Sequence, residues 1–188
     1  MQGCGIIWRR VDVPGHDACW LEEIAGGWRL AGMAVFQHES GPAQLAYEVQ
    51  CDRQWRSLGG GVRGRLGARA IDASVSRSPG GAWMLDGTPV PGLETCEDLD
   101  FGFTPATNLV QLRRLGLATG QARDCPVAWL DEAARGLTLL PQRYQRRSEL
   151  TYWYEAPTVG YAALLELTPA GFARVYPALW RQDGDDQK

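Results

Sequence analysis

The chain has 188 residues, a formal net charge of −3 and an isoelectric point near 5.4. This acidic balance argues against nucleic acid as a partner, because nucleic-acid binders carry a basic excess. The sequence has no run of about 18 consecutive apolar residues, which argues against a membrane span. A chain of this length buries about 70% of the surface that its unfolded form exposes, so we expect one domain over residues 1–188.

The cysteines and histidines indicate the compartment and the absence of a metal. Cysteines are odd in number, widely spaced and without a CxxC pair, which is typical of reduced thiols in the cytoplasm. The N-terminus lacks the apolar core of a signal peptide. His16 and Cys19 lie close together, but no second pair at ligand spacing accompanies them. We therefore expect a cytoplasmic protein with no metal and no cofactor.

Alternation of apolar and polar residues predicts several strands in the first half of the chain. Residues 27–37 and 43–51 alternate on either side of turn-forming residues 39–42, so they are expected to form a hairpin. The triglycine at 59–61 lacks the lysine of a phosphate-binding loop and predicts a flexible turn. The alternation over residues 62–75 changes phase, which predicts a β-bulge or bend near 67–70. Residues 82–85 predict a short strand closed by Asp86-Gly87.

The last third of the chain alternates again. Residues 150–155 and 159–167 each present an apolar face, and turn chemistry at 168–171 precedes another strand over 172–176. The polar residues 182–188 predict a frayed tail. Many strands with few helices indicate a mainly β domain whose long antiparallel sheet must curl and enclose an inner face.

One segment carries helical spacing. Leu109, Leu112 and Leu115 predict a helix over residues 105–117, with Thr104 or Asn108 as N-cap and Gly116 or Gly120 at its end. Gln111 follows Asn108 at capping-box spacing. A strand is the alternative, because residues 110, 112 and 114 also alternate. Residues 129–135 predict a further helical turn.

Carboxylates are dense in residues 94–100. Asp98 and Asp100 alternate, so both can project from one strand face, and one of them is expected to meet Arg113 or Arg114. Acid–base chemistry or a hard cation would also use such a pair. The plainer interpretation is a solvated turn. Aromatic residues gather near the C-terminus in Tyr144, Tyr152, Trp153 and Tyr154, which suits either a core or a ligand pocket.

Several segments resemble the signatures of one bacterial family. The most specific is Thr104-Pro105-Ala106-Thr107-Asn108. The others are Gly27-Trp28, Tyr47 with Cys51-Asp52-Arg53-Gln54-Trp55, Cys96-Glu97-Asp98-Leu99-Asp100, Leu112-Arg113-Arg114-Leu115, Gln142-Arg143-Tyr144-Gln145-Arg146, Tyr152-Trp153-Tyr154 and Tyr176-Pro177-Ala178-Leu179-Trp180-Arg181. Together they resemble the bacterial "putative glycolipid-binding" proteins, formerly a domain of unknown function, over nearly the whole chain. After Asn108 the chain has Leu-Val-Gln-Leu where the family pattern has Thr-Leu-Pro-Ile, and the missing proline favours a helix.

The resemblance implies a spiral β-roll, in which a long antiparallel sheet curls around a single α-helix, and a homodimer. The glycolipid name derives from similarity of that shape to bacterial lipoprotein carriers, which is an argument from fold alone.

Three functions fit the sequence. The first is non-catalytic binding of a glycolipid or related amphiphile, with acyl chains inside the curled sheet and polar side chains at its mouth. The second is a homodimeric interaction module without a small ligand. The third is an enzyme that uses Asp98, Asp100, Arg114 and Tyr144. The structural corner is assigned to Asp98, Asp100, Thr104 and Pro105. The candidate ligand-binding residues are Tyr47, Trp55, Asn108, Arg113, Arg114, Gln142, Tyr144, Tyr152 and Tyr154.

Overall fold

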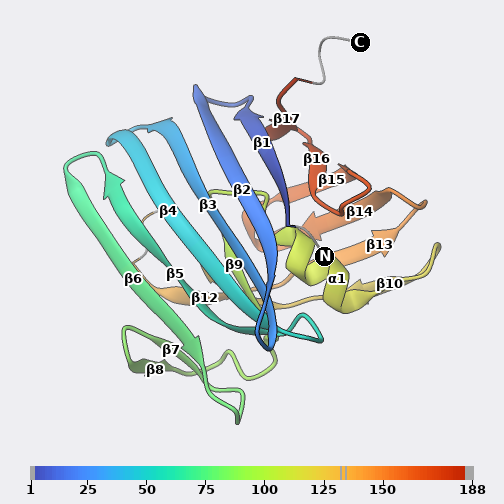
Figure 1. The fold of residues 1–188 in the computed structure, drawn as a ribbon, viewed down its shortest axis with the longest axis horizontal. Coiled ribbons are helices and arrows are strands. Elements are labelled where there is room, and N and C mark those ends of the chain that lie inside the picture. Colours follow the sequence, from blue (N-terminus) through green and yellow to red (C-terminus); the bar gives the residue numbers. More distant parts are fainter. Residues whose placement is uncertain (1–2, 132, 134, 185–188) are drawn as a thin grey trace.

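A computed structural model describes residues 3–131, 133 and 135–184. The chain runs through short turns from strand to strand, and one α-helix interrupts this pattern about midway (Figure 1). The mainly β class and the long antiparallel sheet are therefore confirmed.

Fourteen strands of the described residues form one antiparallel sheet. Most neighbours in this sheet are consecutive in sequence, and the chain ends meet where β17 pairs with β1. From one edge to the other the strands are β10 (Ala122–Asp124), β13 (Arg143–Arg146), β14 (Thr151–Ala156), β15 (Tyr161–Leu167), β16 (Ala173–Tyr176), β17 (Trp180–Gln182), β1 (Cys4–Arg10), β2 (Gly15–Ile24), β3 (Gly27–His38), β4 (Gly41–Asp52), β5 (Ser57–Leu66), β6 (Arg69–Arg77), β7 (Trp83–Leu85) and β8 (Thr88–Val90).

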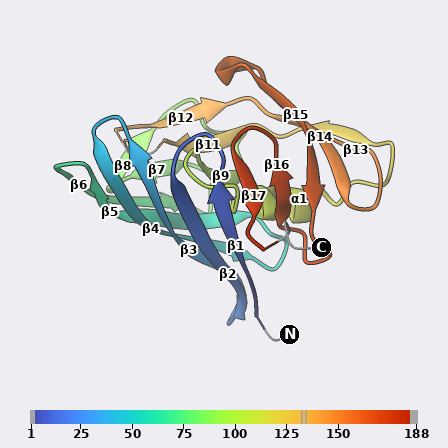
Figure 2. The same cartoon turned by 90° about the horizontal axis from the view of Figure 1, so that it is seen from above.

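A small sheet and the helix lie on the inner side of this long sheet. β9 (Asp98–Phe101) pairs in parallel with β11 (Val127–Leu130), which pairs with β12 (Leu137–Leu140). The helix α1 (Asn108–Leu115) follows β9, and a short 3-10 helix, η1 (Pro157–Val159), joins β14 to β15. The long sheet bends, so that β13–β16 turn away from β2–β6, and α1 and β9 lie between the two halves (Figures 1 and 2).

Alternation along the strands builds the core. One row of paired residues crosses β2–β6 and consists of Leu21, Leu30, Val49, Gly60 and Val75. The four apolar side chains of this row are buried and face inward. Leu99 of β9 and Leu109 of α1, both 0% exposed, pack in the same hydrophobic cluster. The inner side of β2–β6 is therefore filled by apolar side chains of the helix and the small sheet.

The helix is confirmed, with shorter bounds than the predicted 105–117. Its N-cap is Thr107, and no side chain caps it, so neither Thr104 nor Asn108 has the predicted capping role. The predicted capping box is absent because Asn108 and Gln111 both bond Tyr144 instead. Gly116 ends the helix in the left-handed conformation, as expected, and its N–H bonds the carbonyl of Leu112.

Two local predictions were wrong, and a third was right in its position. The phase change in residues 62–75 arises from a tight turn at Gly67-Ala68 between β5 and β6, inside the range predicted for a bulge or bend. The chain reverses there, and the pairing of β5 with β6 contains no bulge. Gly59, Gly60 and Gly61 lie inside β5 and form no turn. Trp129 lies in β11, where pairing with β9 and β12 imposes a strand; residues 132 and 134 of the predicted helical turn lie outside the described residues.

The remaining strand predictions agree with the structure. The 27–37 and 43–51 hairpin is β3–β4, and residues 159–167 and 172–176 supply the paired strands β15 and β16, although Val159 itself belongs to η1. Of the predicted tail, Gln182 ends β17, and residues 185–188 lie outside the described residues.

Candidate functional site

Buried polar side chains gather where β9 leads into α1. Asp98 and Asp100 lie in a strand that is buried throughout, so the solvated turn proposed for residues 94–100 does not extend to them. Burying a carboxylate is unfavourable unless hydrogen bonds or a cation stabilise it. Each buried carboxylate of this region has its own set of partners.

Asp98 is bound by Arg114 of α1. The guanidinium Nε lies 2.9 Å from both carboxylate oxygens, and Nη2 lies 2.6 Å from Oδ2. Arg114 also bonds Glu97 at 2.8 Å. Burial raises the pKa of Asp98, and the guanidinium opposes this shift. The ion pair expected between one acidic residue and Arg113 or Arg114 is thus present, and it ties β9 to the end of the helix.

Asp100 has only neutral partners. Thr107 Oγ1 donates to its Oδ1, and Gln142 Nε2 donates to its Oδ2 at 2.7 Å. Burial raises the pKa of this carboxyl, and the hydrogen bonds from Thr107 and Gln142 oppose the shift. A carboxyl group without a cation beside it favours the protonated form more than one in an ion pair.

Tyr144 links the helix to β13. Its side chain is 0% exposed. Asn108 Nδ2 donates to the Tyr144 hydroxyl at 2.6 Å, and that hydroxyl donates to Gln111 Oε1. Burial raises the pKa of Tyr144 well above its ordinary value, so the hydroxyl stays neutral and holds α1 in place.

A third carboxylate, Asp17 of β2, is buried beneath the Thr-Pro segment. It accepts hydrogen bonds from Tyr47 at 2.9 and 3.0 Å and from Thr104. Burial raises the pKa of Asp17 to about 6, although the Thr104 and Tyr47 hydrogen bonds lower it. These bonds fix Thr104, whose Oγ1 also accepts from the Ala106 N–H at 3.0 Å and so shapes the approach to the helix.

Next to this polar region lies a cavity of about 300 Å³. Its walls are aromatic and aliphatic, and the lining also includes the charged or polar residues Asp100, Thr104 and Asn108. The wall-forming residues come from β9, the segment between β9 and α1, β11, β12, η1 and β14–β17. They are Phe101, Gly102, Pro105, Trp129, Leu140, Tyr154, Ala156, Val159, Tyr161, Tyr176, Leu179 and Trp180.

The tyrosines of this cavity form one contact network. Tyr154 lies against Tyr161 and Tyr176, with ring centroids 5.9 Å from each. Tyr161 stacks on Tyr176 at 5.1 Å, and its hydroxyl donates to the Pro177 carbonyl at 2.7 Å. The rings are therefore held in fixed positions. Concave apolar walls with a few placed polar groups are the usual form of a small-molecule site.

The whole chain can be compared with known proteins. The family model described as "Putative glycolipid-binding" matches residues 5–182. The chain belongs to this family. A crystal structure of a DUF1089 family protein from Pseudomonas aeruginosa is similar in fold, with a TM-score of 0.75 and 23% identity over 96% of this chain and 92% of that one. No curated protein sequence matches the chain.

Within this member of the family, the predicted site residues fall into three groups. Asn108 and Tyr154 line the cavity, and Gln142 and Tyr144 support its floor from behind. Tyr47 and Arg114 are held in the buried hydrogen bonds described above. Of the corner residues, Asp98 ties β9 to α1, whereas Asp100, Thr104 and Pro105 border the cavity.

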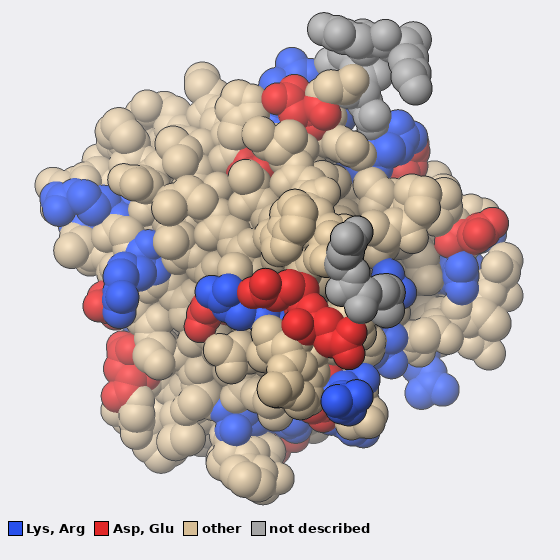
Figure 3. Space-filling view, in the orientation of Figure 1, with Lys and Arg blue, Asp and Glu red and all other residues tan. Residues whose placement is uncertain are grey.

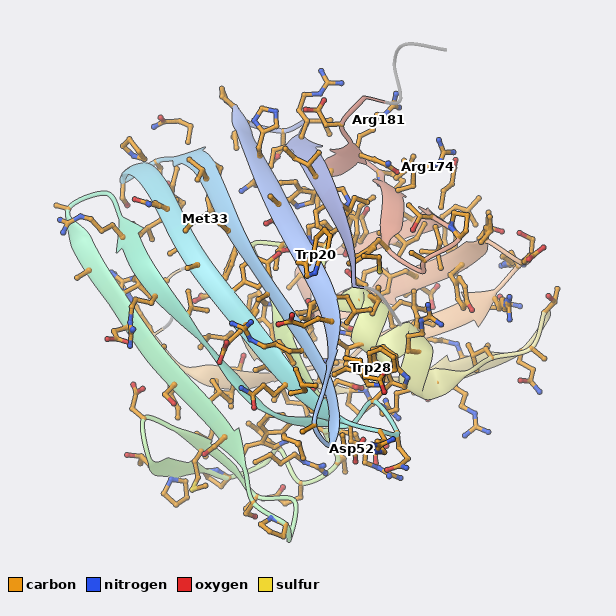
Figure 4. The ribbon with its side chains drawn as sticks, in the orientation of Figure 1. Trp20, Trp28, Met33, Asp52, Arg174 and Arg181 are labelled. Carbon is orange, nitrogen blue, oxygen red and sulfur yellow. The ribbon has the colours of Figure 1, made fainter. Side chains whose placement is uncertain are left out.

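The third group lies on the other side of α1. Trp55, at a left-handed φ of 67°, stacks on Trp28 with centroids 4.5 Å apart. Arg113 lies over the Trp55 ring at 5.7 Å, and Tyr152 lines a separate groove that also contains Arg113. Figure 4 shows Trp28 beside α1. The four residues proposed for an enzyme are likewise divided, because only Asp100 among them borders the cavity.

Sequence reasoning missed Trp129, Tyr161, Tyr176, Leu179 and Trp180 as cavity residues. Tyr161 could be recognised only as one of several inward residues of its strand. The segment from Tyr176 to Trp180 was noticed as a family signature without a role. The wide separation of these residues from Asp100 in sequence left no local signal.

Two further observations concern metal ions and membranes. In the described ranges, no group of three or more His, Cys, Asp and Glu side chains is placed to hold a metal ion. Nor does that part of the chain include a helix long and apolar enough to cross a membrane.

Proposed function

We propose that this protein binds a glycolipid, without catalysis, by holding its sugar headgroup in the aromatic cavity. The observation that carries the proposal is the pairing of fixed aromatic walls with a polar floor. Tyr161 and Trp129 offer ring surfaces to the apolar face of a sugar. Asp100 and Asn108 offer hydrogen-bonding groups to its hydroxyls.

The volume supports a headgroup over an acyl chain. About 300 Å³ is at the lower end of ligand pockets and accommodates a group the size of one sugar ring. The inner side of β2–β6, where acyl chains were expected, is occupied by Leu30, Leu45 and Leu109, each at most 1% exposed. In this proposal the acyl chains lie outside the sheet interior.

Two further parts belong to the proposal. The first is the spiral β-roll that the family resemblance implies, and the bend of the long sheet around α1 supports it. The second is a cytoplasmic location, and it agrees with the cysteines, which are all free thiols, four of them buried.

The test is native mass spectrometry of protein purified from a bacterial host without detergent. We expect a stoichiometric glycolipid adduct. Titration with methyl glycosides of common hexoses should then give a saturable change in tryptophan fluorescence, because Trp129 lines the cavity. Trp129→Ala and Tyr161→Ala should weaken glycoside binding by up to about tenfold, since an aromatic stacking contact contributes about 0.5–1.5 kcal/mol beyond its buried area.

Trp153→Ala is the matched control. Trp153 lies on β14 beside Tyr154 but faces the opposite side, where its Nε1 donates to Glu155 at 3.0 Å. This variant should bind as the wild type does. Absence of both a lipid adduct and any saturable glycoside response would refute the proposal, as would equal losses in Trp153→Ala and Trp129→Ala.

One observation favours a second candidate, the homodimeric interaction module. The outer face of β1–β3 exposes Ile7, Trp20, Met33 and Val35, with Trp20 54% exposed. Ile7, Ala18 and Met33 lie in one row across these strands. Figure 3 shows a broad area with few charged side chains over these strands, and Figure 4 places Trp20 and Met33 on it.

A second copy is the occupant we propose, because a twofold dimer pairs the same patch on both subunits and an apolar face is complementary to itself. Sedimentation at several concentrations should show a dimer, and Trp20→Glu should shift it to monomer. A wild type that is monomeric at every concentration would contradict this candidate.

A further inference from the structure

Beyond the sugar cavity, a second hollow of about 340 Å³ lies on the other side of α1. Its floor is apolar and is formed by Leu109, Leu112 and Leu167, together with the ring of Tyr152. Two arginines, Arg113 of α1 and Arg146 of β13, stand on its walls. Glu149 also contributes to the rim, so the charged lining consists of two cations and one carboxylate.

Both guanidinium groups are held in place by backbone carbonyls. Arg113 donates from Nη2 to the Ala170 carbonyl at 2.7 Å. Arg146 donates to the carbonyls of Leu117, Ser148 and Glu149 at 2.8–3.0 Å. Arg146 also lies over the Tyr152 ring, 5.7 Å from its centroid. Two charged side chains are thus ordered before any ligand arrives, which lowers the entropy lost on binding.

Neither arginine has a carboxylate partner within the described part of the chain. Their sequence neighbours behave differently. Arg114 is bound to Asp98, and Arg143, on the opposite face of β13 from Arg146, pairs with Asp124 at 2.6 Å. Both guanidinium groups lie near the hydroxyl of Tyr152. Burial raises the pKa of this hydroxyl, and the positive charges of Arg146 and Arg113 oppose that rise.

We propose that this groove binds an anionic amphiphile, with a phosphate or carboxylate between Arg113 and Arg146 and an apolar tail on the leucine floor. A planar guanidinium matches the oxygens of either anion. Within the described residues Arg113 donates one hydrogen bond, from Nη2, and both arginines line the same hollow as the apolar floor. The site does not depend on the sugar cavity and uses different side chains.

The experiment is isothermal titration calorimetry of the full chain with three probes below their micelle concentrations. These are octyl phosphate, inorganic phosphate and octyl glucoside. We expect saturable binding of octyl phosphate that weakens with added salt. Inorganic phosphate should bind at least tenfold more weakly because it lacks the tail, and octyl glucoside should not displace octyl phosphate.

Arg113→Gln and Arg146→Gln should each weaken the binding of octyl phosphate at least tenfold, since each removes a cation and its charge-assisted hydrogen bonds to the anion. Because Arg146 also orders three carbonyls, Arg113→Gln is the decisive variant if Arg146→Gln unfolds. Arg143→Gln is the control and should bind normally, and Trp129→Ala, which disables the sugar cavity, should leave octyl phosphate binding unchanged.

Three results would overturn the proposal. If the Arg113→Gln variant binds octyl phosphate as tightly as the wild type does, Arg113 does not hold the anion and the proposed site is refuted. An equal loss of affinity in the Arg143→Gln variant would show that binding depends only on the positive charge of the surface and not on this groove. Inorganic phosphate that binds as tightly as octyl phosphate would refute the assignment to an amphiphile.

Discussion

Tyr152 and Tyr154 project from the same face of β14, yet each borders a different hollow. Tyr154 lines the aromatic cavity, and Tyr152 lines the arginine groove. Next neighbours on one strand face lie about 7 Å apart. The first turn of α1 provides the wall between the hollows, because Asn108 faces the cavity and Leu109 faces the groove. Leu109 is fully buried, so this wall is packed.

This wall leads to a prediction about the two proposed ligands. A methyl glycoside in the cavity and octyl phosphate in the groove should bind at the same time, because they touch different side chains. We expect the dissociation constant of octyl phosphate to change by less than about twofold when the glycoside is saturating, as holds for sites without shared partners. Titration in the presence and absence of glycoside measures this. Mutual exclusion would mean that the hollows form one continuous site.

Asp17 predicts that stability depends on pH. Burial raises the pKa of this carboxyl from 3.8 to about 6. Between these values the folded protein holds a proton that the unfolded chain has released, so stability falls as pH rises. The contribution is complete below about pH 4 and is lost as pH rises through 6. A shift of this size corresponds to about 3 kcal/mol. The raised pKa values of Asp98 and Asp100 act in the same direction.

Asp17→Asn isolates this contribution. The amide keeps the shape of the side chain and can still accept a hydrogen bond from Tyr47, but it does not titrate. Between pH 4 and pH 7, the decrease in the free energy of unfolding should be about 2–3 kcal/mol smaller in this variant than in the wild type. Urea denaturation at several pH values measures the difference. Parallel pH profiles for the two proteins would show that Asp17 ionises as it does in the unfolded chain.

The Asp98–Arg114 pair predicts a strong coupling between two positions. Asp98 is 0% exposed, and the Arg114 side chain is 15% exposed. Asp98→Ala leaves a largely buried guanidinium with only Glu97 and should destabilise the fold by about 3–5 kcal/mol. Arg114→Met leaves the carboxylate buried and should have a similar effect.

The double variant Asp98→Ala, Arg114→Met removes both charges. We expect it to be less destabilised than the sum of the single variants, because no uncompensated buried charge remains. Denaturation of the four proteins completes the cycle. The exposed pair Arg63–Asp72, with side chains 79% and 70% exposed, is the matched control and should show a coupling below about 1 kcal/mol. If the destabilisation of the double variant equals the sum of the two single variants, the ion pair between Asp98 and Arg114 does not stabilise the fold.

Much of the fold could be predicted because alternation is a local signal. The hairpin β3–β4 and the helix at Leu109–Leu115 both follow from periodicity within one segment. The phase change at residues 62–75 was placed correctly near 67–70, but its cause stayed open between a bulge and a bend, since a tight turn and a bulge shift the alternation equally. Trp129 was assigned to a helix because its pairing with Asp100 is parallel and distant in sequence.

The candidate site was less predictable because the signals in the sequence are local, whereas the site combines segments that are far apart in the chain. Asn108, Tyr154 and the Asp98–Arg114 contact lie in or near the segments that the sequence marked. Tyr176 and Trp180 reach the cavity only because β16 and β17 close onto β1 across the sheet. Such long-range pairing leaves no trace in the spacing of neighbouring residues.

The triglycine of β5 provides a last test, because its role depends on this long-range packing. A Cβ at Gly60 would lie 2.2 Å from the Glu48 carbonyl oxygen and 2.9 Å from Leu99 Cδ2. The missing side chain thus lets β9 approach the long sheet. Gly60→Ala should destabilise the fold by about 1–3 kcal/mol through overpacking. Displacement of β9 should also move Asp100 and weaken glycoside binding. Gly136→Ala, where a Cβ meets nothing within 4 Å, is the control and should be near neutral. A flexible turn at residues 59–61 would instead tolerate both substitutions equally.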